Sequence, residues 1–270
     1  MTAPIVSATS TRDHARRSGG GARFAAALSG LRRAQKPGAG VPAYTRWVNR
    51  GLARFVAAGA FTLGLTPNAV TTISAVLSFA GLALVVALPV APAVGFGAAA
   101  LLAAGYVLDS ADGQVARLAR RGSPAGEWLD HVVDSIRTPA IHLAVFVGLA
   151  ATPSVGEWPR YVALAFCVMS VGQFMSQILA EQLSGAKAPA TASAGVRQSL
   201  ILLPTDMGVL CLAFAAWGYP DLFVIVYTSL FVLNAVHTLV SMRRKYVRLT
   251  ALGSTRGSHV VGSTESTGEA

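Results

Sequence analysis

Four aspartates stand close together in the segment "LDSADGQVARLARRGSPAGEWLDHVVDSI", residues 108–136, between two long apolar runs. Asp109 and Asp112 are three residues apart and Asp130 and Asp134 four apart, so on helices each pair projects from one face. Carboxylate oxygens are the ligands that hard divalent cations such as Mg²⁺ prefer. Two such ions would balance the four negative charges. The spacing therefore predicts a site for two metal ions, provided that the two helices meet.

The residues around the aspartates indicate what such a site would bind. Four ionised aspartates in hydrocarbon would cost on the order of 10 kcal/mol, so they need compensating charge. Gly113 removes a side chain directly after Asp112, small Ala116 lies one turn beyond, and Arg117 presents a planar fork suited to phosphate. Carboxylates, metal and an arginine together indicate a diphosphate. The alternative is a set of structural ion pairs with the nearby arginines, Arg117, Arg120, Arg121 and Arg137.

The elements that would position these residues are membrane helices. The chain has 270 residues, of which 53% are hydrophobic and 13% charged, and its mean hydropathy is +0.53. A soluble domain carries roughly a quarter charged residues. Apolar runs near the ~20 residues that cross a bilayer recur along most of the chain. We therefore predict an all-α, polytopic membrane protein with six spans, over residues 69–90, 94–117, 127–150, 159–182, 199–217 and 221–242.

The segment before the first span has an amphipathic pattern. In "YTRWVNRGLARFVAAGAF", residues 44–61, Arg46, Arg50 and Arg54 share one stripe of a helix and apolar side chains lie opposite. This pattern is typical of a helix that lies in the membrane interface, with guanidinium groups among lipid phosphates. An ordinary surface helix is the alternative.

The net charge of +10 is concentrated at the chain ends and in two connections. Residues 1–40 and 249–270 have the composition of disordered tails, the first of them basic, and they flank a membrane domain over 41–248. Further basic residues lie within 117–121 and 187–197. The positive-inside rule then places both termini and the acidic segment in the cytoplasm. We expect contact with anionic membrane lipids and no nucleic-acid binding, because no base-reading module accompanies the charge.

The acidic segment resembles the signature of the CDP-alcohol phosphotransferase (CDP-alcohol phosphatidyltransferase) family, D-x-x-D-G-x-x-A-R-x8-G-x-x-x-D-x-x-x-D. Every fixed position is matched, by Asp109, Asp112, Gly113, Ala116, Arg117, Gly126, Asp130 and Asp134. The resemblance covers roughly residues 44–245, and the family's six-span architecture agrees with the predicted count. The stretch "SPAGEWLDHVVDS" is similar to the choline/ethanolamine phosphotransferase branch, in which a histidine follows the third aspartate.

The resemblance implies an enzyme of phospholipid biosynthesis that transfers the phospho-alcohol part of a CDP-linked alcohol to an acceptor hydroxyl and releases CMP. It implies that the four aspartates hold two ions, Mg²⁺ or Mn²⁺, and that Asp134 is the general base, with His131 as a second candidate. The residues implied to contact the donor are Gly113, Ala116, Arg117 and Gly126. The acceptor is a lipid or a polar alcohol, since both kinds of enzyme share the motif, and the His131 context favours a lipid. Homodimers are common in the family.

Five residues outside the signature carry two interpretations each. Asn68 and Thr71 line the nucleotide pocket, or they cap and start the first span. Lys187 and Arg197 hold a phosphate of the acceptor, or they only set the topology. Asp206 lines an acceptor pocket, or it is a solvated helix end.

Two other functions are compatible with acidic residues in membrane helices. Intramembrane prenyltransferases also use Mg²⁺ on a diphosphate, but they place two acidic motifs in well-separated helices. A cation-coupled transporter would use intramembrane carboxylates and often has two related halves, whereas the acidic segment has no second copy here. Release of CMP from a CDP-alcohol separates the phosphotransferase from both.

Overall fold

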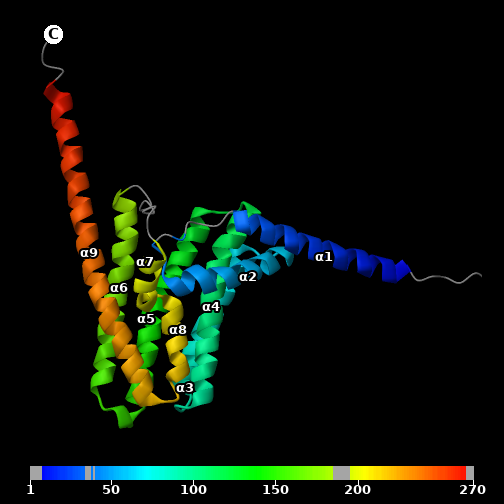
Figure 1. The fold of residues 1–270 in the computed structure, drawn as a ribbon, viewed down its shortest axis with the longest axis horizontal. Coiled ribbons are helices and arrows are strands. Elements are labelled where there is room, and N and C mark those ends of the chain that lie inside the picture. Colours follow the sequence, from blue (N-terminus) through cyan, green and yellow to red (C-terminus); the bar gives the residue numbers. More distant parts are fainter. Residues whose placement is uncertain (1–7, 34–37, 39, 185–194, 266–270) are drawn as a thin grey trace, which may run out of the picture.

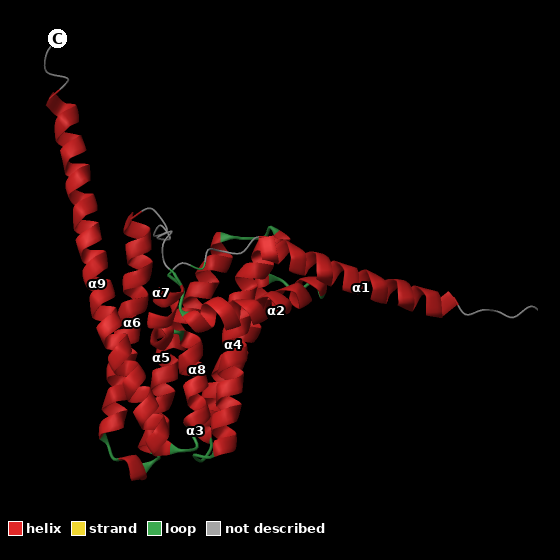
Figure 2. Cartoon of the chain, in the orientation of Figure 1, coloured by secondary structure: helices red, strands yellow, loops and turns green. Residues whose placement is uncertain are grey.

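Every regular element that the structure describes is a helix. The computed structural model describes residues 8–33, 38, 40–184 and 195–265, and Figures 1 and 2 show the arrangement of the elements. In chain order the elements are α1 (Ala8–Arg33), the π-helical turn η1 (Thr45–Asn49), α2 (Arg50–Thr62), α3 (Pro67–Ala87), α4 (Pro92–Ala119), α5 (Pro124–Ala150), η2 (Pro153–Val155), α6 (Trp158–Ser184), α7 (Val196–Ile201), η3 (Leu203–Thr205), α8 (Met207–Ala213), η4 (Phe214–Ala216) and α9 (Pro220–Glu265). The predicted all-α fold is confirmed.

Five helices are long and apolar enough to cross a membrane, by length and composition. They are α3, α4, α5, α6 and the Pro220–Leu252 part of α9. In Figure 1 these helices run side by side as a bundle. The protein is therefore an integral membrane protein.

The segment predicted as the fifth span, residues 199–217, is not one helix. It is divided into α7, η3, α8 and η4, and its apolar part is a shorter helix, Met207–Ala216. Pro204 has no backbone N–H to continue a helix. The backbone of Asp206 is extended, and its carboxylate accepts a hydrogen bond from the Gly208 N–H at 3.0 Å, which starts α8 anew. The predicted count of six spans is not confirmed.

Two helices that carry site residues, α3 and α5, begin with the same capping pattern. Thr66 and Ser123 are the N-cap residues of α3 and α5, and each side chain accepts a hydrogen bond from the backbone N–H three residues later. Pro67 and Pro124 follow at the first helical position, where a missing N–H costs nothing. The capped start of α5 therefore defines where Asp130, less than two turns further on, lies along the helix axis.

Helix α3 packs against both α4 and α5 and so holds the two aspartate-bearing helices together. Its crossing with α4 is close. A Cβ atom on Gly105 would overlap the Ser78 hydroxyl and lie 3.0 Å from the Ser74 carbonyl oxygen. The Ser74 hydroxyl donates to the Gly105 carbonyl at 2.8 Å, and Arg137 of α5 donates to the same hydroxyl at 3.3 Å. Small residues at a helix crossing allow this approach in a membrane protein.

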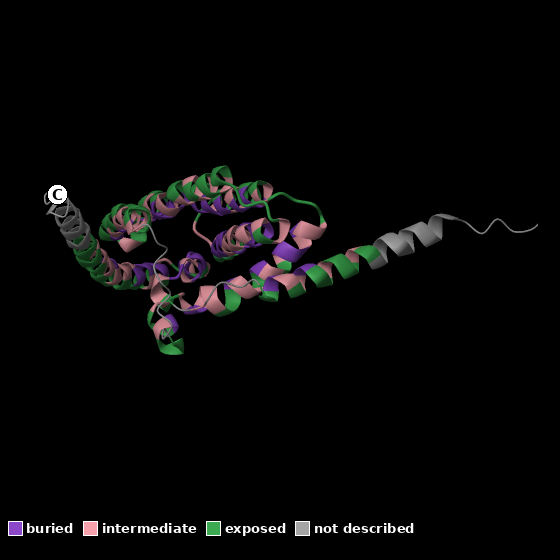
Figure 3. Cartoon of the chain, turned by 90° about the horizontal axis from the view of Figure 1, so that it is seen from above, coloured by how far each residue is buried: buried purple, intermediate pink, exposed green. Residues whose placement is uncertain are grey.

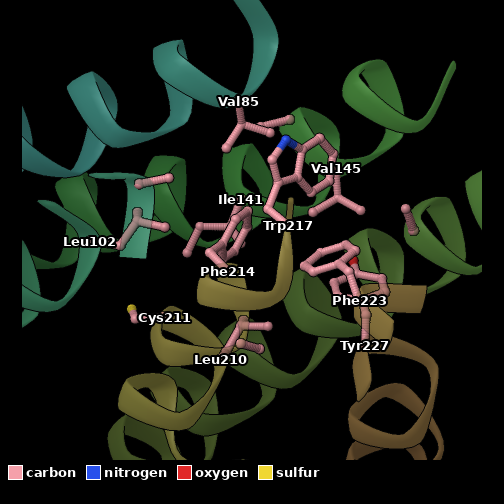
Figure 4. Packing of buried hydrophobic residues seen from close by; sticks show 14 of the residues in the cluster. Val85, Leu102, Ile141, Val145, Leu210, Cys211, Phe214, Trp217, Phe223 and Tyr227 are labelled. Carbon is pink, nitrogen blue, oxygen red and sulfur yellow. The ribbon is translucent and has the colours of Figure 1, made fainter. Parts of the chain in front are cut away.

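The largest cluster of buried apolar residues lies between α3, α4, α5, α6, α8 and α9 (Figure 4). Trp217, Tyr227, Phe214 and Phe223 are its largest fully buried side chains. A Cβ atom on Gly148 would lie 2.6 Å from the Trp217 ring, so the indole packs directly on the α5 backbone. Figure 3 shows the buried residues on the inner faces of the helices. This core fixes the bundle from which the site is built.

Both predicted tails contain helix in the described ranges. Helix α1 occupies residues 8–33, and near its carboxyl end Ala27 and Leu31 are buried against α2 and α4. In Figure 1 the rest of α1 projects away from the bundle. At the other end, α9 continues to Glu265. For α1, the difference from the expected tail has a physical reason, because an apolar face at its carboxyl end finds a partner.

The predicted amphipathic segment, residues 44–61, is helical as η1 and α2 and lies across the bundle (Figure 1). Its exposed apolar side chains are Trp47, Val48, Leu52 and Phe55, and the alanines opposite are buried. Arg46 donates to the Ser199 hydroxyl of α7 at 2.9 Å. Arg46 of the arginine stripe thus makes a contact within the protein, while the apolar stripe faces outward.

Candidate active site

Three of the four signature aspartates converge. Asp109 and Asp112 come from α4 and Asp130 from α5, and each offers one carboxylate oxygen such that these oxygens lie within 4.8 Å of one another. The predicted convergence of the two aspartate pairs is therefore confirmed for these three residues, and α3 packs against both helices that carry them. Three oxygen ligands from two helices form a group that can hold a hard metal ion.

The fourth aspartate, Asp134, is held by an arginine. Nη2 of Arg137 contacts Oδ1 of Asp134 one turn away on α5, and it also contacts Oδ1 of Asp109 at 2.9 Å. Arg137 is 4% exposed, so both ion pairs are shielded from solvent. The alternative of structural aspartate–arginine pairs thus applies to Arg137. Within the described ranges, none of the other three nearby arginines forms a salt bridge with these aspartates.

The remaining carboxylates fit a metal ion. Asp112 is 6% exposed, and among the described residues neither it nor Asp130 has a salt-bridge partner. Thr71 of α3 donates to Oδ2 of Asp112 at 2.6 Å, which orients the carboxylate without neutralising its charge. A buried carboxylate is costly unless a cation compensates it. The chemistry and the spacing of these oxygens would suit a hard cation.

The aspartates open into a cavity of about 260 Å³. Asp109, Asp112 and Asp130 line one part of it, and Arg50 and Arg117 also line it. The other lining residues are Leu31, Thr45, Ser110, Gly113 and Gln114. The cavity therefore combines carboxylates that can bind metal with two guanidinium groups that suit phosphate.

A second cavity, of about 290 Å³, lies between α5, α6, η3, α8 and α9. Its wall includes Asp206, which is 2% exposed and was a candidate for an acceptor pocket. Oδ2 of Asp206 accepts the Thr45 N–H at 2.7 Å, and Oδ1 accepts the Thr45 hydroxyl at 2.8 Å. Thr45 lines the first cavity and Asp206 lines the second, so the Thr45–Asp206 contact separates the two cavities.

A comparison with protein families decides what these cavities belong to. Residues 64–241, more than half of the chain, match the family model described as CDP-alcohol phosphatidyltransferase. The chain belongs to the CDP-alcohol phosphatidyltransferase family. Among curated proteins, none matched the chain. As a CDP-alcohol phosphatidyltransferase it transfers a phospho-alcohol from a CDP-alcohol and works in phospholipid synthesis, and the prenyltransferase and transporter interpretations are set aside.

Part of the first cavity is lined by residues that precede the segment matched by the CDP-alcohol phosphatidyltransferase family model. Leu31 of α1, Thr45 of η1 and Arg50 of α2 all precede residue 64. Partial burial lowers the pKa of Arg50, and the neighbouring Arg46 lowers it further. The sequence pattern of residues 44–61 singled out Arg50 as a residue that contacts lipid headgroups. It did not predict that Arg50 lines the cavity beside the aspartates. No sequence pattern singled out Leu31 or Thr45.

The residues predicted to contact the CDP-alcohol take different positions. Gly113 and Arg117 line the cavity, and a Cβ atom on Gly113 would meet only Arg117 Nη1 at 3.7 Å. A Cβ atom on Gly126 would lie 3.2 Å from Asn68 Oδ1, so these residues bring the starts of α5 and α3 together. Ala116 is half-buried beside the cavity-lining residues, not among them.

Two predicted residues, His131 and Arg197, do not line the first cavity, and a third lies outside the described residues. His131 is exposed and meets the edge of the Phe174 ring at a centroid distance of 6.5 Å. Arg197 is exposed and lines neither cavity. Lys187 lies outside the described residues.

Proposed function

We propose that the four signature aspartates bind two divalent cations, Mg²⁺ or Mn²⁺, and that the cavity beside them binds the diphosphate of the CDP-alcohol. The observation that carries this proposal is the convergence of Asp109, Asp112 and Asp130 within 4.8 Å. The four carboxylates also carry more negative charge than Arg137 alone can balance. When bound, two such ions would neutralise the diphosphate and stabilise the attacking and leaving oxygens of an in-line displacement.

The residues around the aspartates have distinct proposed roles. Arg117 and Arg50 grip the phosphates, and Gly113 lets the nucleotide lie against α4 because no side chain fills that space. Thr71 orients Asp112 through their 2.6 Å hydrogen bond. Asn68 and Gly126 keep the starts of α3 and α5 together. Ala116 and, outside the described residues, Lys187 remain candidates for contacts with substrate.

Asp134 is the proposed general base. Arg137 contacts only its Oδ1, and within the described chain Oδ2 has no hydrogen-bond partner. That oxygen is therefore free to accept the proton of the attacking hydroxyl. His131, the other candidate, is exposed and packs against Phe174, which favours a structural role.

We further propose that the active site faces the cytoplasm and that both termini lie on that side. The basic residues of the α4–α5 connection, Arg120 and Arg121, and of α9 after Ser241 support this orientation through the positive-inside rule and attract anionic lipids. Membership of the choline/ethanolamine branch and a homodimer stay proposals, supported by the resemblance alone.

The test is release of CMP by the purified protein. We expect CMP release from a CDP-alcohol to require Mg²⁺ or Mn²⁺ and to be abolished by Asp130→Asn, because the amide retains the shape but loses the charge that binds a cation. Asp221→Asn is the matched control, since Asp221 is exposed in the first turn of α9. Full CMP release by Asp130→Asn, or release unaffected by a chelator, would contradict the proposed metal site.

A further inference from the structure

Asp206 is a buried carboxylate that the proposed reaction does not use. It is 2% exposed and lies at the break between η3 and α8. Its Oδ2 accepts the Thr45 N–H at 2.7 Å, and its Oδ1 accepts the Thr45 hydroxyl at 2.8 Å and the Gly208 N–H at 3.0 Å. The protein therefore engages both oxygens, and two of these three hydrogen bonds come from a single residue of η1.

The geometry suits aspartate and excludes the isosteric asparagine. Oδ2 faces the Thr45 N–H and Oδ1 faces the Gly208 N–H. Because a backbone N–H can only donate, an asparagine side chain would direct its own NH2 group at one of these donors in either orientation. A carboxylate accepts on both sides, and each hydrogen bond that it receives offsets part of the cost of its burial. The contact with η1 therefore depends on the two acceptor oxygens of Asp206.

Further contacts hold η1 between α4 and α8. The Tyr106 hydroxyl of α4 lies 2.7 Å from the Thr45 hydroxyl, and since the proton of that threonine goes to Asp206, Tyr106 is the donor. A Cβ atom on Gly208 would lie 2.1 Å from the Tyr44 ring, so this ring packs directly on the α8 backbone. In Figure 1, α8 runs within the bundle and α2, which continues η1, lies across it. Asp206 thus joins the crossing segment to the bundle.

Thr45 in turn holds Arg50. η1 is a π-helical turn, and the Arg50 N–H donates to the Thr45 carbonyl at its end. Turns of this kind, closed by hydrogen bonds between residues five apart, are rare and frequently lie at functional sites. The two ends of this turn, Thr45 and Arg50, line the first cavity together with the three converging aspartates. The direction in which the Arg50 guanidinium enters this cavity therefore depends on where Thr45 is held.

We infer that Asp206 is a positioning residue for donor binding, which fixes the η1 turn through Thr45 so that the Arg50 guanidinium meets the diphosphate. The inference rests on the proposed role of Arg50 as a phosphate contact. Asp206 itself lines the second cavity and is not among the described residues that line the first. It acts through Thr45 and Arg50, which precede the family match, whereas Asp206 lies within it. Asp206 therefore connects the segment before residue 64 to the core of the enzyme.

The first experiment measures the affinity for CDP, which all CDP-alcohols contain, with the purified full chain in detergent and Mg²⁺. We expect Asp206→Asn to raise the Kd for CDP about tenfold, as for loss of one buried hydrogen bond. Asp221→Asn is the matched control, because Asp221 is exposed, and its Kd should equal the wild-type value. An unchanged Kd in folded Asp206→Asn would overturn the inference.

A milder variant tests the same contact if Asp206→Asn fails to fold. Thr45→Val removes the hydroxyl but retains the backbone N–H that reaches Oδ2 of Asp206. We expect a severalfold rise in the Kd for CDP. Thr62→Val is the control, since the Thr62 hydroxyl bonds to the Ala58 carbonyl of its own helix, α2. A wild-type Kd in Thr45→Val would contradict the inference.

A double-mutant cycle with Arg50→Ala separates positioning from general stability. If Asp206 acts through Arg50, adding Asp206→Asn or Thr45→Val to Arg50→Ala should not raise the Kd for CDP further, since no guanidinium remains to be misplaced. Effects that multiply would indicate an independent structural role and overturn the inference. An unchanged Kd in Arg50→Ala alone would instead contradict the proposed phosphate contact, and the inference with it, while the metal site at the aspartates would stand.

Discussion

The four signature aspartates share a short segment but have different partners. Arg137 contacts Asp109 and Asp134, Thr71 donates to Asp112, and Asp130 faces the other carboxylates across the cavity. Helical spacing predicts that each pair shares a face, but it cannot predict which side chain of another helix lies opposite. The four aspartates therefore differ in how they are oriented, Asp109 and Asp134 by a guanidinium group and Asp112 by a hydroxyl group.

At this scale we predict that Thr71→Val weakens metal binding. Valine has the shape of threonine but cannot donate to Asp112 Oδ2, so the carboxylate loses the 2.6 Å bond that orients it. Loss of such a partner typically lowers metal affinity by about 10–100-fold. The measurement is the Mg²⁺ or Mn²⁺ concentration that gives half-maximal CMP release. Thr72→Val is the control, since Thr72 is exposed and bonds only within its own helix. An unchanged metal requirement in Thr71→Val would remove the orienting role.

Among the elements, α3 has the largest effect on the geometry of the site. It packs against both α4 and α5 and carries Thr71 and Ser74, which contact Asp112 and Arg137. The two helices with the aspartates are therefore aligned by a third helix that carries none of the four. A motif search finds the aspartates and misses this element, because small residues at a crossing have no distinctive pattern in a chain rich in alanine and glycine.

We predict that Gly105→Ala destabilises the α3–α4 crossing and reduces activity. The added Cβ would overlap the Ser78 hydroxyl and approach the Ser74 carbonyl, one turn before Asp109. Overpacking of this kind costs about 1–3 kcal/mol, so the melting temperature in detergent should fall and CMP release should fall with it. Gly172→Ala is the control, because its Cβ would lie 3.7 Å from a flexible Met242 methyl group. Equal melting temperatures for the two variants would show that the crossing tolerates a side chain.

For the molecule as a whole, the sequence predicts the features that depend on local residue patterns. The apolar runs predict the five long helices, and the acidic signature predicts the aspartates that converge, Asp109, Asp112 and Asp130. The break within 199–217 was not predicted, because its apolar composition masked the effects of Pro204 and Asp206. The contribution of α1 to the wall of the first cavity was not predicted either. A segment rich in glycine, alanine and arginine has the composition of a disordered tail, and only contact with α2 and α4 buries a few of its side chains. Such contacts depend on tertiary packing, which periodicity does not report.

The last prediction follows from that packing. Leu31 is 2% exposed, packs with residues of α2 and α4 and lines the first cavity, although it precedes the family match. Leu31→Ala removes buried contacts typically worth about 2–5 kcal/mol, which is enough to release the end of α1 without unfolding the bundle. We expect faster tryptic cleavage at Arg32 and Arg33 and a severalfold higher KM for the CDP donor. Leu63→Ala, at a leucine that is 79% exposed, should change neither. If Leu31→Ala retained both the cleavage rate and the donor KM, α1 would be a neighbour of the cavity and not part of its wall.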